Sequence, residues 1–161
     1  MPVHEPMSVE AALKSLQFTS GWPQRVSREL ASLGSLLSVS AGEVLFHEGG
    51  SNGRVSLGAS GRIGIEMLLP GRGRLRVLSL GPGDVVAWSA VLDSGKMTAT
   101  GVAEEPSLLL VMSGAHLRQL CARDHEVGYF VMQRLAEAVS RRLVATSLQL
   151  LDIFGCDEPA P

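Results

Sequence analysis

Aromatic side chains, cysteines and net charge are all scarce in this chain of 161 residues. Aromatic residues make up 4% of it, two residues are cysteines, and the formal net charge at pH 7 is −2. The near-neutral charge gives no overall attraction to nucleic acid. Cys121 and Cys156 are too far apart in the sequence for the paired spacing of a zinc site. No apolar run approaches the roughly 20 residues that a membrane-spanning helix needs.

The chain lacks the sequence motifs that are typical of secreted proteins, of several enzyme classes and of histidine-based metal centres. The first ten residues, MPVHEPMSVE, contain neither the basic segment nor the apolar stretch of a signal peptide, so we expect a cytoplasmic protein with reduced thiols. No P-loop and no Ser-His-Asp arrangement is visible, so no enzyme is expected. His47 is the only histidine among the predicted strands, which argues against a histidine-based metal centre.

Glycine, in contrast, is abundant, and thirteen of the eighteen glycines lie between Gly42 and Gly101. They separate short apolar runs at roughly even spacing, and glycine readily adopts the positive φ that tight hairpin turns require. The pattern predicts an antiparallel β-roll (jelly roll) over residues 35–112. Strands are expected at residues 43–48, 62–69, 74–77, 98–102 and 108–112.

Helices are predicted on both sides of this roll. Ser8 is expected to cap a first helix, and Gly34 to end a second helix that begins at Pro23. Beyond residue 112 the apolar period becomes helical, with a short helix over residues 113–122 and a long one from Asp124 to about residue 154. We therefore expect one α+β domain with helices in residues 1–34, the roll in 35–112 and C-terminal helices in 113–161.

The long helix predicted after Asp124 carries an apolar residue at every fourth position. These residues are Val127, Val131, Leu135, Val139 and Leu143. Because a small roll cannot cover a helix of this length, the sequence predicts a homodimer formed through the C-terminal helix. The alternative is that the helix breaks and folds back onto its own roll. Arg141 and Arg142 form a basic spot on the same helix, of a kind that is ordinarily solvated.

Four stretches occur in a distinctive order: AGEVLFHEGGSNGR (41–54), SGRIGIEM (60–67), LSLGPGDVVAWSAVL (78–92) and KMTATGVA (96–103). Together they resemble the cyclic-nucleotide-binding domain of the catabolite-activator and fumarate–nitrate regulator family of bacteria. The resemblance implies a β-roll followed by a short and a long helix, and a regulatory role. Many relatives carry a helix-turn-helix domain after the long helix. Here seven residues follow Phe154, so we expect no direct DNA recognition by this chain.

In relatives that bind cyclic AMP, the segment after the Gly-Asp turn supplies backbone N–H groups, a glutamate for the ribose hydroxyl and an arginine for the phosphate. By resemblance, Trp88 occupies the glutamate's position and Met97 the arginine's, while Thr98 keeps a hydroxyl. Lys96 is one residue away, on a strand position that faces the opposite side. Losing a bidentate arginine contact weakens phosphate binding by on the order of 10²–10⁴-fold.

The resemblance therefore places a ligand site at Ala87, Trp88, Ser89, Lys96, Met97 and Thr98, with backbone N–H groups offered by Ala87 and Ser89. No cofactor is expected, and cyclic AMP in its usual pose is disfavoured. Trp88 and Met97 indicate either an apolar or stacking ligand, or a pocket filled by its own side chains.

Three functions are compatible with these residues. The first is a stand-alone sensor of an unidentified small ligand that signals through its C-terminal helix. The second is a ligand-free dimerisation or docking module, and the third is a transcription regulator that acts through a separate DNA-binding partner. A sensor needs a cavity beside Trp88, whereas a docking module should have that space filled.

Overall fold

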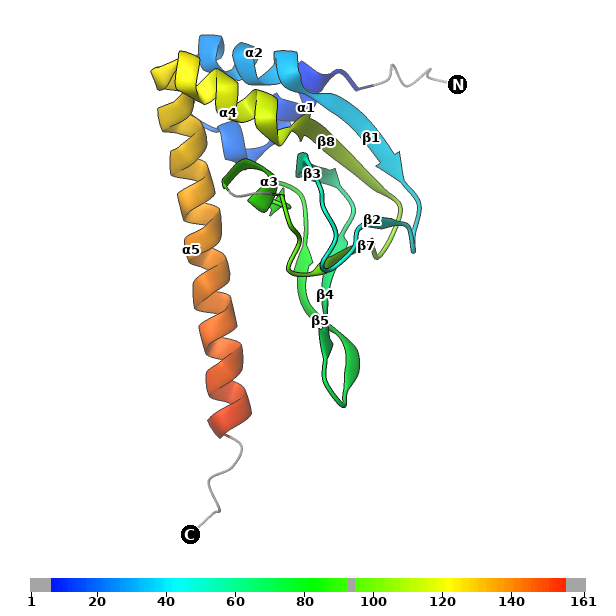
Figure 1. Ribbon diagram of the computed structural model, residues 1–161. Helices are drawn as coiled ribbons and strands as arrows, with labels where there is room; N and C mark the ends of the chain where they lie inside the picture. The colour runs from blue at the N-terminus through cyan, green and yellow to red at the C-terminus, as the bar shows by residue number, and fades with distance from the viewer. Residues whose placement is uncertain (1–6, 93–94, 156–161) are drawn as a thin grey trace.

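Two antiparallel sheets and a layer of helices make up the computed structural model, which describes residues 7–92 and 95–155 (Figure 1). The first sheet has the order β1 (Ser35–Val39), β8 (Ser107–Ser113), β3 (Arg54–Ser60) and β6 (Val85–Val86). The second has the order β2 (Val44–Phe46), β7 (Thr100–Ala103), β4 (Ile63–Leu69) and β5 (Gly73–Leu80). The α+β class and the antiparallel β-roll are thus confirmed.

The helices are α1 (Val9–Ser15), the 3₁₀ turn η1 (Gln17–Thr19), α2 (Gln24–Leu33), α3 (Ser89–Leu92), α4 (Gly114–Arg123) and α5 (His125–Gly155). The predicted cap of α1 is confirmed, because the Ser8 hydroxyl accepts a hydrogen bond from the Ala11 N–H at 3.1 Å. Helix α2 begins at Gln24, one residue after the predicted start at Pro23, and ends before Gly34 as predicted. None of the described helices is both long and apolar enough to cross a bilayer. Cys156 and the loop residues 93–94 lie outside the described residues.

Strand β8 joins two separate cores. Its Leu109 and Val111 point into the roll and pack with residues of both sheets, while Leu110 and Met112 point to the other face and pack under the helices. A central strand that is buried on both faces reads as a continuous apolar run, which is why LLLVM contains no alternation. The helical layer therefore covers the outer face of the first sheet.

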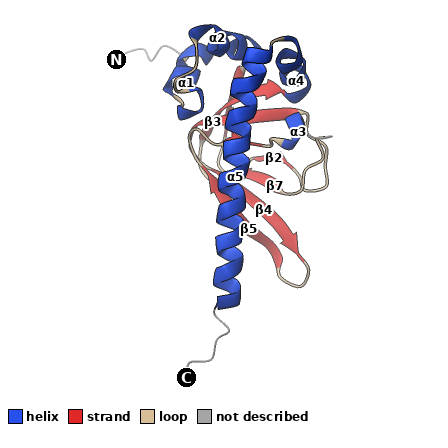
Figure 2. Cartoon of the chain, turned by 90° about the vertical axis from the view of Figure 1, so that its left-hand side faces the viewer, coloured by secondary structure: helices blue, strands red, loops and turns tan. Residues whose placement is uncertain are grey.

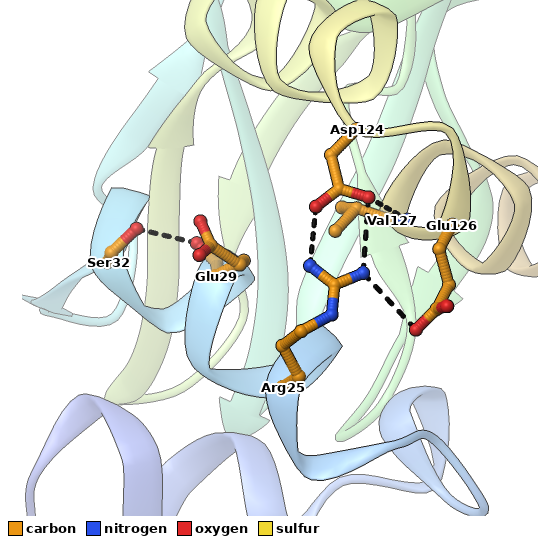
Figure 3. Close-up of polar contacts among 6 residues, drawn as sticks. All are labelled: Arg25, Glu29, Ser32, Asp124, Glu126 and Val127. Atoms are coloured by element: carbon orange, nitrogen blue, oxygen red, sulfur yellow. Dashed lines mark hydrogen bonds and ion pairs between the residues drawn. The ribbon is translucent and has the colours of Figure 1, made fainter.

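An ion-pair cluster fixes the point where α5 leaves α4 (Figure 3). The Arg25 guanidinium of α2 lies 2.5 Å from one Asp124 oxygen and 3.2 Å from a Glu126 oxygen. Asp124 also accepts a hydrogen bond from the Val127 N–H at 3.2 Å, so it caps α5 as predicted. Its hydrogen bonds with Arg25 and Val127 lower the pKa of the Asp124 carboxyl to about 2.

Helix α5 is one continuous element of 31 residues that runs beside the roll and past the β4–β5 hairpin (Figures 1 and 2). The alternative in which this helix breaks and folds back is therefore wrong, because the capped start and the unbroken helical pattern leave no stop signal inside it. Its first turns bury Val127 and Val131 completely, whereas Leu143, Val144, Leu148 and Leu151 are 56–66% exposed. Near its far end the Gln149 amide donates to the Val77 carbonyl of β5 at 3.1 Å.

Three strands were not foreseen, and the first predicted strand is shorter than expected. Strands β1, β3 and β6 lie in segments to which the glycine and apolar pattern assigned no strand, and β2 spans Val44–Phe46 instead of residues 43–48. Strand β3 is rich in small residues because it passes close to the turn before β6. A Cβ on Gly58 would lie 2.6 Å from the Gly81 carbonyl oxygen. Such a contact cannot be deduced from the strand's own sequence.

Candidate functional site

The segment that the resemblance singles out begins with a tight turn after β5. The Asp84 carboxylate accepts a hydrogen bond from the Gly81 N–H at 2.9 Å, and this turn leads into β6 and α3. Between them Ala87 has a φ of 63° and is the one non-glycine residue with positive φ in the described part of the chain. That conformation costs an L-residue roughly 1–2 kcal/mol, and such strain occurs preferentially at functional sites.

The backbone reversal at Ala87 sends neighbouring side chains to different cores. Ala87 packs against the apolar cluster inside the roll, whereas Trp88 packs against the cluster under the helices. The guanidinium carbon of Arg142, on α5, lies 3.8 Å from the centroid of the Trp88 ring. Stacking of this kind contributes about 0.5–2 kcal/mol, depending on how far it is desolvated. Trp88 thus links the segment before α3 directly to α5.

Residues 96–98 alternate in exposure, and Lys96 and Met97 pair through their backbones with residues 49–51. Met97 is buried, with 3% of its surface exposed, and its sulfur is 4.0 Å from the Asn52 amide nitrogen. Lys96 and Thr98, on either side of it, are exposed. Lys96 pairs through its backbone with Ser51 and faces away from Met97, as the strand alternation predicts.

Two neighbouring clefts lie between the roll and α5. One has a volume of about 210 Å³ and is lined by Leu78, Ser79, Leu80, Asp84, Val85, Trp88, Ala138, Arg141, Arg142 and Ala145. The other has a volume of about 460 Å³ and is lined by Gln17, Phe18, Ser20, Pro82, Gly83, Asp84, Arg134, Glu137 and Arg141. Of the six predicted site residues, only Trp88 lines either cleft. The structure therefore places Trp88 beside an open space on the α5 side and Met97 in a packed environment.

Arg142 is the site residue that the sequence did not connect with Trp88. Burial lowers the pKa of its guanidinium to about 10, and the nearby Asp84 carboxylate partly opposes this effect. A usable signal was present, because Ala138, Arg141, Arg142 and Ala145 follow the i, i+3, i+4, i+7 spacing of one helix face. Two alanines around an arginine pair leave room for a cleft on that face. Among the described residues, no group of three or more metal-ligating side chains is positioned to hold a metal ion.

Comparisons with known proteins identify the same architecture. Residues 36–124 match the family model of the cyclic nucleotide-binding domain. No curated protein sequence matches the chain significantly. A cyclic nucleotide-binding domain from Methylobacillus flagellatus is similar in structure with a TM-score of 0.76 at 19% identity, over 96% of this chain and 84% of that one.

Two further solved structures share the fold over most of this chain. The Thermus thermophilus catabolite activator protein has a TM-score of 0.70 at 25% identity, over 86% of this chain and 62% of that one. The regulatory domain of Toxoplasma gondii PKA, in a structure with cAMP, has a TM-score of 0.66 at 15% identity, over 80% of this chain and 49% of that one.

Proposed function

This chain belongs to the cyclic nucleotide-binding domain family, and on that premise we propose that it binds a small ligand beside Trp88 and transmits binding through α5. The family's members are regulatory rather than catalytic, and the fold supports a regulatory, ligand-binding module. The observation that carries the finer proposal is the stacking of Arg142 on Trp88 at 3.8 Å. Both residues line the adjacent cleft, so a ligand there contacts the segment before α3 and α5 together and favours one pose of α5 over another.

Cyclic AMP in its usual pose is not the ligand that we propose. Trp88 provides no carboxylate for a ribose hydroxyl, and the buried Met97 provides no cation for a phosphate. Lys96 is exposed and faces away from Met97, so it does not replace the missing arginine. The ligand that suits the cleft makes its main contacts with Trp88 and α5.

The second part of the proposal is a homodimer formed through α5. Leu143, Val144, Leu148 and Leu151, all in the C-terminal half of α5, expose more than half of their surfaces, and this helix runs beside the roll in Figure 2. Apolar side chains grouped in this way on one element are typical of an interface, and a second copy of the same helix presents a complementary apolar surface.

One observation favours a ligand-free docking module as a second candidate. Met97 is 3% exposed and the Trp88 ring is already stacked by Arg142, so side chains occupy both positions that anchor a ligand in the relatives. In that case α5 and its exposed leucines would be the functional surface, and no small molecule would stabilise the fold.

A thermal-shift panel separates the two candidates. The purified chain is melted with cyclic AMP, cyclic GMP, cyclic dinucleotides and small aromatic acids at millimolar concentration. A ligand present at 100 times its Kd stabilises the fold by about 2.7 kcal/mol, which raises Tm by several degrees. Any compound that does so is then tested for its effect on hydrogen exchange in α5. A flat panel, or a bound ligand that leaves α5 exchange unchanged, would refute the sensor and favour the docking module.

A further inference from the structure

The Arg142 guanidinium has N–H groups that are available to a ligand. A guanidinium carries five N–H donors in a fixed fork. One face of the Arg142 group stacks on Trp88, yet within the described ranges none of its N–H groups donates to a protein acceptor and no carboxylate lies within ion-pair distance. Arg134, two turns earlier on α5, differs in this respect. It donates to the Phe18 and Ser20 carbonyls at 2.7 Å each and pairs with Glu137 at 3.1 Å.

The charges around the 210 Å³ cleft are unequal in sign. Arg141 and Arg142 line it from α5, and Asp84 is the one carboxylate among the residues that line it. One Asp84 oxygen is already committed to the turn, where it accepts from the Gly81 N–H at 2.9 Å. Two guanidinium groups against one carboxylate leave a net charge of about +1 inside a partly desolvated space, which favours a monoanion.

Apart from these charged residues and Ser79, the residues that line this cleft are apolar. Leu78 and Leu80 come from β5, Ala138 and Ala145 come from α5, and Trp88 completes the apolar lining with Val85. Ligand sites for drug-sized molecules have volumes of about 300–1,000 Å³, so a cleft of about 210 Å³ suits a smaller molecule than a nucleotide. A ring that carries one acidic group matches both the walls and the charge.

We infer that this cleft binds a small aromatic carboxylate, whose oxygens accept hydrogen bonds from Arg142 while its ring lies between the Trp88 edge and the alanines of α5. The inference rests on the proposed sensory function and names its ligand class. The proposed ligand also contacts its cation at a different place in the fold from the one used by the relatives. In the relatives, the resemblance gives the arginine to the segment around position 97, whereas here the cation is Arg142 of α5.

The test uses 2-naphthoate as the probe and 2-naphthalenemethanol as its neutral counterpart. The chain has two tryptophans, so a ¹⁵N spectrum of the full chain shows two indole N–H signals, which Trp22→Phe assigns. We expect 2-naphthoate to shift the Trp88 signal and not that of Trp22. The neutral counterpart should bind at least about 10-fold more weakly, because it lacks the charged hydrogen bond.

Arg142 variants then locate the anion contact. Arg142→Met should weaken 2-naphthoate by about 10-fold or more, and Arg142→Lys by less, since it keeps the charge but loses the fork. Arg72→Met removes the same charge from the exposed hairpin and serves as the matched control with unchanged affinity. If Arg142→Met does not fold, the comparison of Arg142→Lys with Arg72→Met decides.

The outcomes separate this inference from the proposed function. Absence of a Trp88 shift with 2-naphthoate, equal affinity for the two probes, or unchanged affinity in the Arg142 variants overturns the inference. A different compound that binds and alters α5 exchange would still leave the sensory function standing. Conversely, 2-naphthoate binding that depends on Arg142 but leaves α5 exchange unchanged supports the inference and refutes signalling through α5.

Discussion

Replacing Met97 with arginine would restore the cation that the resemblance places at this position. Met97 is 3% exposed and its sulfur lies 4.0 Å from the Asn52 amide nitrogen, so an arginine there brings a charge into a buried position unless the roll opens. An uncompensated buried charge costs about 3–5 kcal/mol, and for a domain of this size Tm should fall by roughly 6–20 °C. Met97→Leu keeps the apolar volume and should cost less than about 1.5 kcal/mol.

Cyclic AMP should then rescue the arginine variant. A bidentate guanidinium–phosphate contact recovers on the order of 10²–10⁴ in affinity, and ligand at 100 times its Kd restores about 2.7 kcal/mol. The assay is a melting curve of the wild type, Met97→Leu and Met97→Arg, each with and without millimolar cyclic AMP. We expect a response to cyclic AMP in Met97→Arg alone.

Two results would refute this reasoning in different ways. If Met97→Arg has the same Tm as Met97→Leu in the absence of ligand, the side chain at position 97 reaches solvent and its environment is not packed. If Met97→Arg is destabilised but does not respond to cyclic AMP, position 97 does not correspond to the phosphate-binding position of the relatives.

Three other predictions concern the scaffold. Gly114→Ala should lower Tm by several degrees, because its Cβ would lie 2.0 Å from a backbone carbonyl oxygen of α3, whereas Gly81→Ala meets nothing within 4 Å and is the control. The interactions that lower the pKa of Asp124 stabilise the fold above about pH 4, where the carboxyl is ionised in both the folded and the unfolded chain. This stabilisation is lost as the pH falls to about 2. Asp124→Asn should therefore remove part of the acid unfolding in that range, and coincident acid-unfolding curves would contradict the ion-pair account. Leu148→Glu on α5 should shift sedimentation to the monomer, while Leu68→Glu on β4, where the leucine is 63% exposed against 57% for Leu148, should not.

Much of the fold could be predicted from the sequence, because caps, turns and helical periods depend on neighbouring residues. The Ser8 and Asp124 caps, the hairpin turn at residues 70–73 and the apolar period of α5 all depend on residues close together in the chain. The strands that were not predicted, β1, β3 and β6, lack such local signals. In β3, small residues are required by the distant turn at Gly81, so long-range crowding overrides the preference for bulky strand residues.

The site was harder to predict from the sequence, because it depends on one backbone angle and one long-range contact. An alanine gives no sequence sign of a φ of 63°, yet this angle at Ala87 determines that Trp88 faces α5. Arg142 lies 54 positions further along the chain (142 minus 88), so no local pattern pairs it with Trp88. The resemblance identified the position of Trp88 but carried no information on its new partner.

Moving the cation from the segment around residue 97 to α5 has a thermodynamic consequence. Both arginines that line the cleft, Arg141 and Arg142, belong to α5, so an anion is held only while α5 is docked against the roll. Coupling between two equilibria is reciprocal: if the ligand favours the docked helix by some factor, then docking of the helix raises ligand affinity by the same factor. Any contact that stabilises the docked helix therefore also strengthens ligand binding. If a second copy packs on Leu148 and its neighbours, dimer formation and ligand affinity are linked. The dimer dissociation constant should then change with 2-naphthoate in the wild type and stay constant in Arg142→Met.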